Sequence, residues 1–241
     1  MIGQMISKKP YVIANIDATT PWVTVFTFKS ADGSTLDFEP GMFGMLTYRD
    51  PVTGAETTRA FSFASMPGTD TVEFTISMIH GRFTSHLDDA KIGDVYYLTG
   101  PYGQFKFDRS KAKILCIAGG TGIAPFLSMF REKKRDGLLV DCTLIYSVKY
   151  PKDIIRETEL RQLHKDIGVN TVVTVTRPNE LPEPWSGETG HIDSKMIAKY
   201  VGDVAGRKCY ICGPLAFVKA IKAALKELSV KDEDVKADVW G

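Results

Sequence analysis

The segment from Ala118 to Pro125 reads Ala-Gly-Gly-Thr-Gly-Ile-Ala-Pro and stands where an apolar run changes into a helical pattern. Glycine has no side chain, so the backbone here can approach an anionic group closely. A following helix would point its free N–H groups and positive dipole end at the same place. The segment therefore predicts a pyrophosphate-binding turn. Its glycine spacing differs from G-x-G-x-x-G and no acidic residue awaits the ribose, which disfavours an ordinary Rossmann dehydrogenase.

Cys209 and Cys212 are a second candidate, because a C-x-x-C pair at a helix start can form a redox dithiol. The run from Lys208 to Cys212 is instead typical of a strand, on which residues three apart point to opposite faces. With Cys116 and Cys142 scattered elsewhere, we expect reduced thiols rather than a disulfide framework. We also expect no metal or iron-sulfur centre, since no further ligands cluster nearby.

Composition excludes several classes of partner. The chain has 241 residues, 44% of them hydrophobic, which suffices for one large or two ordinary domains. Its 30 basic residues nearly balance 29 acidic ones, so no overall field favours nucleic acid or anionic lipid. The longest apolar run is far shorter than the ~20 residues that span a bilayer, and we see no secretion signal. We therefore expect a cytoplasmic protein without a membrane span.

The first half, residues 1–107, consists of short alternating segments rich in β-branched and aromatic residues. They are 11–14, 22–28, 44–48, 71–77 and 94–98. Period-two patterning with a turn signal about every ten residues predicts an antiparallel sheet sandwich or small β-barrel. One short helix is expected to be capped by Thr84 and to run to about Ala90.

The second half, residues 108–241, changes pattern after a short linker at about 108–113. Continuous apolar strands are expected at 114–118, 144–148, 171–175 and 209–212, and helices at 125–134, 157–165, 195–200 and 216–228. Buried strands alternating with helices are typical of a doubly wound α/β domain with a parallel sheet. Such sheets bind ligands at the carboxyl ends of their strands.

Five motifs occur in a characteristic order along the whole chain. They are Arg-Ala-Phe-Ser at 59–62, Gly-Arg-Phe-Thr-Ser-His-Leu at 81–87, Gly-Pro-Tyr-Gly at 100–103, the glycine turn at 119–125, and Cys-Gly-Pro at 212–214. Together they resemble the ferredoxin-NADP reductase superfamily. The resemblance implies an antiparallel, Greek-key β-barrel that binds flavin, followed by a doubly wound α/β domain that binds a nicotinamide dinucleotide. It favours FAD over FMN, although FMN-using relatives share the first motif.

For the flavin, the resemblance implies that Arg59 pairs with a phosphate, a contact that a guanidinium makes well. Phe61 would lie against the ring system, and Ser62 would offer its hydroxyl to flavin N5. Backbone amides and side chains of the second motif would bind the pyrophosphate. The other residues expected to contact FAD are Ala60, Ile76, Gly81, Arg82, Phe83, Thr84 and Ser85.

For the nicotinamide dinucleotide, the resemblance places Gly120, Thr121 and Pro125 at the pyrophosphate and Cys212, Gly213 and Pro214 beside the nicotinamide. Asp238 and Trp240 resemble a terminal acid-x-aromatic pair whose aromatic covers the flavin, but here one glycine follows the aromatic. Ser62, Cys212 and Asp238 are the catalytic candidates. Lys149 and Arg177, with His191 further on, stand where relatives bind a 2′-phosphate, so the sequence leans toward NADPH over NADH.

The expected function is transfer of hydride from NADPH or NADH to bound FAD, with electrons passed singly to a separate acceptor protein such as a ferredoxin. The chain would then be a ferredoxin-NAD(P) reductase or the reductase component of an oxygenase. Alternatives are a flavin reductase that uses flavin as a diffusing substrate, and a non-catalytic nucleotide-sensing module. Lys106, Arg109, Lys111 and Lys113 could meet an acidic ferredoxin, although charged loops are more often only solvated.

Overall fold

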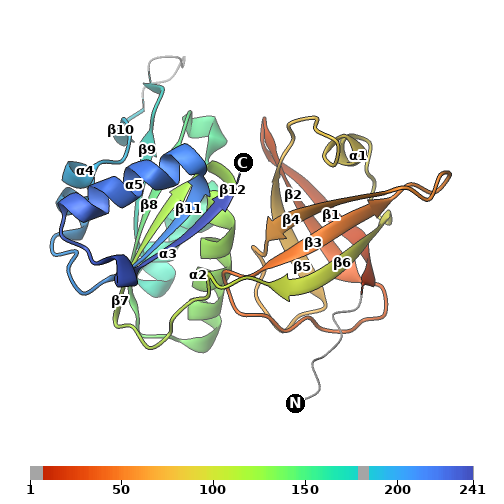
Figure 1. The fold of residues 1–241 in the computed structure, drawn as a ribbon, viewed down its shortest axis with the longest axis horizontal. Helices are drawn as coiled ribbons and strands as arrows, with labels where there is room; N and C mark the ends of the chain where they lie inside the picture. The colour runs from red at the N-terminus through yellow and green to blue at the C-terminus, as the bar shows by residue number, and fades with distance from the viewer. Residues whose placement is uncertain (1–7, 179–184, 241) are drawn as a thin grey trace.

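The computed structural model describes residues 8–178 and 185–240. It contains an antiparallel β-barrel and a three-layer α/β domain, which lie side by side, with the last described strand, β12 (Val235–Trp240), on the side of the α/β domain that faces the barrel (Figure 1). The expectation of these two fold classes in this order is confirmed. No helix of the described residues is long and apolar enough to cross a membrane.

The barrel is a six-stranded sheet in the order β4-β3-β6-β1-β2-β5. Its strands are β1 (Lys9–Thr20), β2 (Val23–Ser30), β3 (Phe43–Arg49), β4 (Glu56–Ser62), β5 (Thr71–Ser77) and β6 (Val95–Tyr102), and the pairs between neighbouring strands are antiparallel. The two edge strands approach each other, since the rings of Phe61 on β4 and Phe74 on β5 lie 5.9 Å apart. Alternation on β5 sends Val72, Phe74 and Ile76 into the barrel core.

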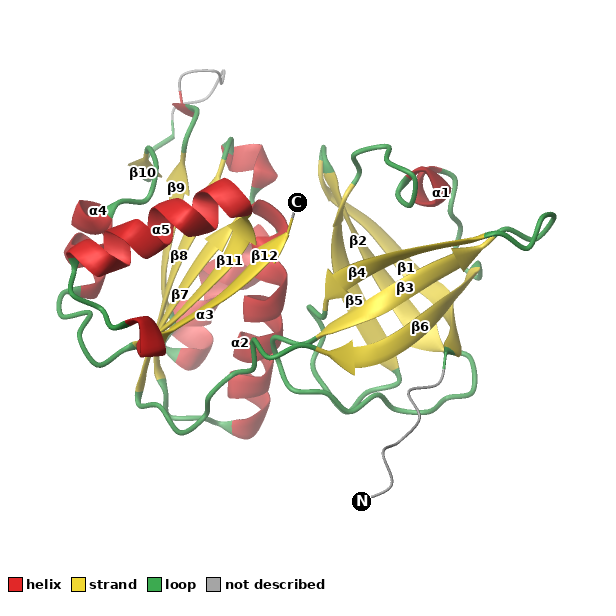
Figure 2. Ribbon diagram, viewed as in Figure 1, coloured by secondary structure: helices red, strands yellow, loops and turns green. Residues whose placement is uncertain are grey.

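The second sheet is parallel, in the order β10-β9-β8-β7-β11-β12. Its strands are β7 (Lys113–Gly119), β8 (Asp141–Val148), β9 (Asn170–Val175), β10 (Glu188–Thr189), β11 (Lys208–Pro214) and β12 (Val235–Trp240). The helices are α2 (Ala124–Asp136), α3 (Glu157–Ile167), α4 (Ser194–Val201) and α5 (Leu215–Glu227). α2 and α3 share one core with the sheet, and α4 and α5 share another (Figure 2). The strands are buried from both sides, as their continuous apolar sequence requires.

The C-x-x-C pair lies on strand β11, as its pattern indicates. Cys209 packs in the core with α4 and α5, whereas Cys212 packs in the core with α2 and α3. The two thiols therefore point to opposite faces of the sheet. Burial raises the pKa of Cys209 to about 12 and raises that of Cys212 as well. This arrangement excludes a dithiol between these two residues.

One local expectation is wrong, and two local features were not predicted. The glycine turn leads first into a 3-10 turn, Gly120–Ile123, which was not predicted, and helix α2 then starts at Ala124, one residue before its expected position. The short helix α1 (Ser85–Asp88) is a single turn that Thr84 does not cap, because the Thr84 hydroxyl accepts the Gly81 N–H at 2.9 Å instead. The terminal segment is an edge strand, β12, paired with β11. Its register sets Asp238 beside Cys212.

Candidate functional site: a pocket at the seam of the two domains

A pocket of about 620 Å³ opens between the barrel and the α/β domain. All seven residues of β4 line it on the barrel side, with residues from β5 and the 79–84 segment. The facing wall is formed by the glycine turn, the start of α2 and the carboxyl ends of β11 and β12. The pocket therefore lies where a doubly wound sheet presents its ligand-binding edge.

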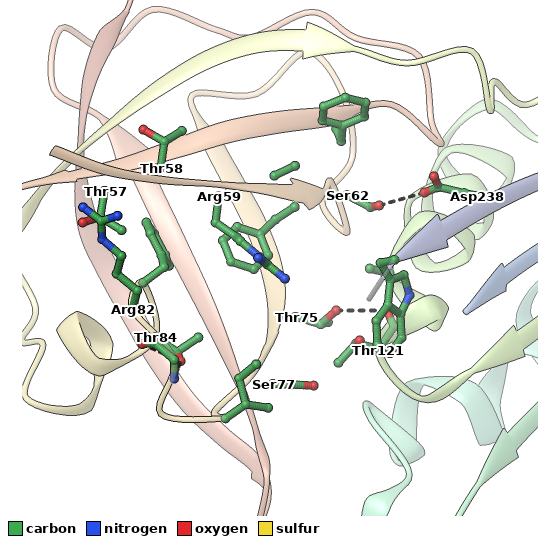
Figure 3. A pocket seen from close by; sticks show the side chains of 18 of the residues that line it. Thr57, Thr58, Arg59, Ser62, Thr75, Ser77, Arg82, Thr84, Thr121 and Asp238 are labelled. Atoms are coloured by element: carbon green, nitrogen blue, oxygen red, sulfur yellow. Dashed lines mark hydrogen bonds between the residues drawn. The ribbon is translucent and has the colours of Figure 1, made fainter. Parts of the chain in front are cut away.

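The barrel wall is long and carries positive charge. β4 extends about 20 Å at ~3.3 Å per residue, so the pocket suits an extended ligand. Arg59 and Arg82 both lie along this wall (Figure 3), and within the described chain neither guanidinium forms an ion pair or hydrogen bond. Two uncompensated guanidiniums on one wall favour an anionic ligand such as a diphosphate.

The segment at 81–84 adds backbone donors to this wall. Among the described residues, the N–H groups of Arg82, Phe83 and Thr84 donate to no protein acceptor, and all three residues line the pocket. The Thr84 hydroxyl is occupied by the Gly81 N–H. Because α1 is only four residues long, its dipole adds little; the N–H groups and the Arg82 charge are the features suited to phosphate oxygens.

The glycine turn contributes Thr121 to the opposite wall, and two of its glycines serve internal packing. A Cβ on Gly122 would lie 2.2 Å from the carbonyl oxygen of Cys212, so only glycine allows the turn to meet β11. Gly119 faces the ring of Phe217, and a Cβ there would lie 3.1 Å from it. Gly120 has φ +56° and open space around its Cβ position. Gly120 is therefore the glycine of the turn whose open side is available to a ligand.

Ser62, Cys212 and Asp238 converge at the end of the pocket, although they come from three strands. The Ser62 hydroxyl donates to Asp238 Oδ2 at 3.4 Å (Figure 3). The Cys212 Sγ lies 3.9 Å from the same oxygen. Burial raises the pKa of the Asp238 carboxyl, which these hydrogen bonds only partly offset. Burial and the nearby Asp238 charge raise the pKa of the Cys212 thiol. The cluster therefore holds a neutral thiol beside a carboxyl that retains its proton to a higher pH than usual.

The mouth of the pocket is apolar. Val239 and Trp240 line it and are 45% and 38% exposed. Trp240 pairs with Pro214 at the open end of the β11–β12 ladder. An indole in this position could be displaced by an incoming ring without breaking the sheet.

Several residues expected in the site do not line the pocket with their side chains. Ile76 is 1% exposed and packs in the barrel core, so only its backbone could contact a cofactor. Lys149 and Arg177 lie apart from the pocket, at the ends of β8 and β9, where the Arg177 N–H donates to the Lys149 carbonyl at 3.0 Å. The others outside the lining are Ser85, Gly120, Pro125, Gly213 and Pro214.

Conversely, pocket residues that the five motifs did not include are Phe43, Glu56, Thr57, Thr58, Thr75, Ser77, Ile79 and Val239. Strand alternation could have indicated Thr75 and Ser77. If Ile76 is assigned to the barrel core, its two neighbours on β5 must face outward. Thr57 and Thr58 lie on β4, upstream of the Arg59 motif, and no motif marks them.

Comparison with known proteins agrees with this geometry. Residues 12–107 match the family model described as the oxidoreductase FAD-binding domain, and residues 116–223 match the oxidoreductase NAD-binding domain. The chain belongs to the ferredoxin-NADP reductase superfamily. FAD and a nicotinamide adenine dinucleotide are the cofactor and co-substrate that these two domains bind.

Among curated relatives, superfamily members with reductase roles are similar over most of this chain. The glycine betaine monooxygenase reductase subunit of Chromohalobacter salexigens is 29% identical over 210 residues, which are 85% of this chain and 56% of that protein. The reductase component of the Pseudomonas putida naphthalene 1,2-dioxygenase system is 28% identical, covering 85% of this chain and 61% of that protein. The chain thus spans less than two thirds of the length of these relatives.

A solved structure confirms the fold of this superfamily member. The FAD/NAD-binding domain of nitric oxide dioxygenase from Vibrio cholerae superimposes with a TM-score of 0.86 at 20% identity, covering 97% of this chain and 98% of that one. The residues of the pocket also fit FAD: two unpaired guanidiniums, a run of unused N–H groups and a wall of extended length match a long, doubly anionic molecule.

Proposed function

We propose that this chain is an oxidoreductase that accepts hydride from NADPH or NADH onto bound FAD and delivers electrons singly to a separate acceptor protein, such as a ferredoxin. The observation that carries the proposal is that one pocket is lined both by β4, the flavin-side strand, and by Thr121, Cys212 and Asp238 from the dinucleotide domain. Bound FAD supplies the chemistry that joins a two-electron donor to one-electron acceptors.

The chain's own residues then bind and orient. Arg59, Arg82 and the N–H groups at 82–84 would hold the FAD phosphates, and Phe61 would pack against its ring. Ser62 would donate to the flavin atom that accepts hydride, so its hydroxyl would exchange Asp238 for the flavin. Cys212 would bound the nicotinamide position. Hydride transfer needs little acid or base assistance, so positioning supplies most of the acceleration.

We place the boundary between the flavin domain and the dinucleotide domain at residues 107 and 108. We further propose NADPH as the preferred donor, because Lys149 and Arg177 lie together at the ends of adjacent strands, where two cations can meet a 2′-phosphate. For the acceptor, the printed roles of the curated relatives support an electron-transfer partner. The basic residues at the domain junction give weaker support for an acidic partner protein. Two of their charges are already neutralised within the chain, because Lys106 pairs with Glu39 and Arg109 pairs with Glu132.

The test is steady-state turnover with the purified protein, after incubation with FAD and removal of the unbound flavin. NADPH-dependent reduction of ferricyanide, and of cytochrome c only when a ferredoxin is added, would support the proposal. A colourless protein that reduces added free flavin instead would identify a flavin reductase. Yellow protein that reduces no acceptor with either nicotinamide would identify a nucleotide-binding module without catalysis.

A further inference from the structure

Contacts across the pocket itself are weak. Two hydrogen bonds between described residues cross it, from Ser62 to Asp238 and from the Thr75 hydroxyl to the Thr121 carbonyl, and both are 3.4 Å long. Bonds of this length contribute little to holding two domains. The distance between the two walls must therefore be set by contacts outside the pocket.

Beside the pocket lies a much tighter set of contacts, centred on Glu73 of β5. Arg131 of α2 donates to Glu73 Oε1 at 2.8 Å, and Arg156, just before α3, donates to Glu73 Oε2 at 2.7 Å. Arg156 also pairs with Asp17 of β1 at 2.6 Å, and Arg131 also donates to the Ala64 carbonyl at 2.8 Å. Each guanidinium thus joins the dinucleotide domain to more than one strand or loop of the barrel.

This cluster is partly buried, which strengthens it. The Glu73 side chain is 12% exposed, and those of Arg131 and Arg156 are 23% and 22% exposed. Ion pairs shielded from water are screened less by salt than surface pairs. A glutamate that loses one partner here would be left as a partly buried charge with a single counterion.

Arg156 makes these contacts from a strained backbone conformation. Its φ is +55°, a left-handed conformation that residues other than glycine and asparagine rarely adopt, and its Nε is buried without a hydrogen-bond partner. Such strain persists where surrounding contacts enforce it. The ion pairs of this residue to Asp17 and Glu73 of the barrel are contacts suited to hold it in this conformation.

Strand β5 links this cluster to the pocket. Glu73, Thr75 and Ser77 project from the same face of β5, in steps of about 6.7 Å. Thr75 contacts the glycine turn through Thr121, and Thr75 and Ser77 line the pocket. Fixing Glu73 against α2 therefore helps to fix where the glycine turn lies along the flavin-side wall, together with the Ser128 hydroxyl of α2, which donates to the Ser65 carbonyl at 2.7 Å.

We propose that Glu73 is a positioning residue for hydride transfer: by binding Arg131 and Arg156 it sets the distance and angle at which the dinucleotide domain faces the flavin pocket. The expected effect on the rate of hydride transfer rests on the proposed function. The expected effect on the arrangement of the two domains does not. Glu73 itself lies outside the pocket lining.

The structural consequence is measured on the apoprotein, without cofactor. All four cysteines are buried, so Ile92→Cys in the barrel and Lys222→Cys on α5, both exposed positions, can be spin-labelled selectively. Pulsed dipolar spectroscopy should give one narrow distance distribution for the parent and a broadened one for Glu73→Gln. The matched control is Asp166→Asn, which breaks an ion pair with Lys134 inside the dinucleotide domain and should leave the distribution narrow.

The kinetic consequence is measured by anaerobic stopped flow on the FAD-loaded protein. Glu73→Gln should bind FAD as tightly as the parent but reduce it between about 10- and 100-fold more slowly at saturating nicotinamide, the loss expected from misplacement by about 1 Å. The absorbance band of the nicotinamide–flavin complex should weaken in parallel. Asp166→Asn should match the parent in both measurements.

Arg156→Asn is the second variant, in case Glu73→Gln does not fold. Asparagine tolerates the left-handed conformation, so this change removes both ion pairs without adding strain and should reproduce the broadening and the slower reduction. Unchanged distances and rates in the variants that fold would overturn the positioning role. If the parent itself binds no FAD or is not reduced, the proposed function fails, and the distance measurement still decides whether Glu73 couples the domains.

Discussion

Ser62 and Asp238 are 176 positions apart in the chain, yet the Ser62 hydroxyl donates to the Asp238 carboxylate across the seam between the domains. The acceptor carboxylate is partly buried and its neighbours are a hydroxyl and a thiol, and none of the described residues places a cation beside it. A site built in this way is suited to bind a ring system that displaces water. Because burial raises the pKa of Asp238 in the folded protein, the free energy of unfolding depends on the protonation of this carboxyl.

The first prediction concerns the pH dependence of Asp238. Because burial raises its pKa in the folded state, the folded protein binds this proton more tightly than the unfolded chain does. The stability that the protonated group provides is present below the unfolded value of about 4 and is lost as pH rises through the folded value. At neutral pH, Asp238→Asn should therefore increase the free energy of unfolding of the apoprotein, and the gain should disappear near pH 4.

Urea unfolding at a series of pH values measures this difference. Asp166→Asn, at a partly exposed ion pair, should change the free energy of unfolding little. A constant loss of stability at every pH in Asp238→Asn would show that the carboxylate is well accommodated and that the assigned direction of the shift is wrong.

The second prediction concerns the cationic wall. Arg59→Ala should raise the dissociation constant for FAD about 10- to 100-fold, since a hydrogen bond to a charged group contributes about 1.5–3 kcal/mol. Arg82→Ala should have an effect in the same direction. Flavin fluorescence titration of the apoprotein measures both. Arg161→Ala, a surface residue paired with Glu157 on α3, should bind FAD normally; equal weakening in this control would argue against a specific phosphate contact.

The third prediction compares the loss of stability when alanine replaces each of two glycines with different surroundings. Gly122→Ala would force a Cβ to 2.2 Å from the Cys212 carbonyl oxygen, so the turn or β11 must move. We expect a loss of about 3 kcal/mol or more, the scale of overpacking against backbone. Gly137→Ala, at a helix end with φ +62° and nothing within 4 Å, should cost only about 1 kcal/mol. Denaturant unfolding of both apoproteins checks the order, and the reverse order would refute the packing role of Gly122.

The fourth prediction concerns the choice of nicotinamide. Arg177→Ala and Lys149→Ala should each lower kcat/KM for NADPH by about 10-fold or more, the value of losing a charged hydrogen bond, and should change kcat/KM for NADH much less. Parallel steady-state assays with both donors measure the ratio. An equal effect on both donors would place these residues outside a 2′-phosphate site.

Much of the fold is predictable from the sequence, because period-two alternation and buried apolar strands are local signals. β5 and β7 are examples, and so is the interpretation of Cys209 and Cys212 as strand residues. The ends of the glycine turn are not predictable in this way. The 3-10 turn at 120–123 arises because Gly122 must approach Cys212, a contact 90 residues away that no local pattern encodes.

The site is predictable where a motif carries it and hidden where tertiary contacts create it. The motif residues Arg59, Phe61 and Ser62 line the pocket. Ile76 belongs to the barrel core, whereas Thr75 faces out of the barrel and is buried next to the second domain, where its hydroxyl donates to the Thr121 carbonyl. Glu73 could not be singled out, since a lone acid on a strand usually faces solvent; its two arginine partners come from segments distant in the chain.

The central claim is that FAD and a nicotinamide occupy the two walls of one pocket. Anaerobic addition of NADPH or NADH to the FAD-loaded protein, followed by flavin absorbance, tests it most directly. We expect the flavin absorbance to bleach stoichiometrically, at a rate on the order of 10 per second, which is a typical enzyme turnover number. A protein that retains FAD but whose absorbance is unchanged by either nicotinamide would contradict it.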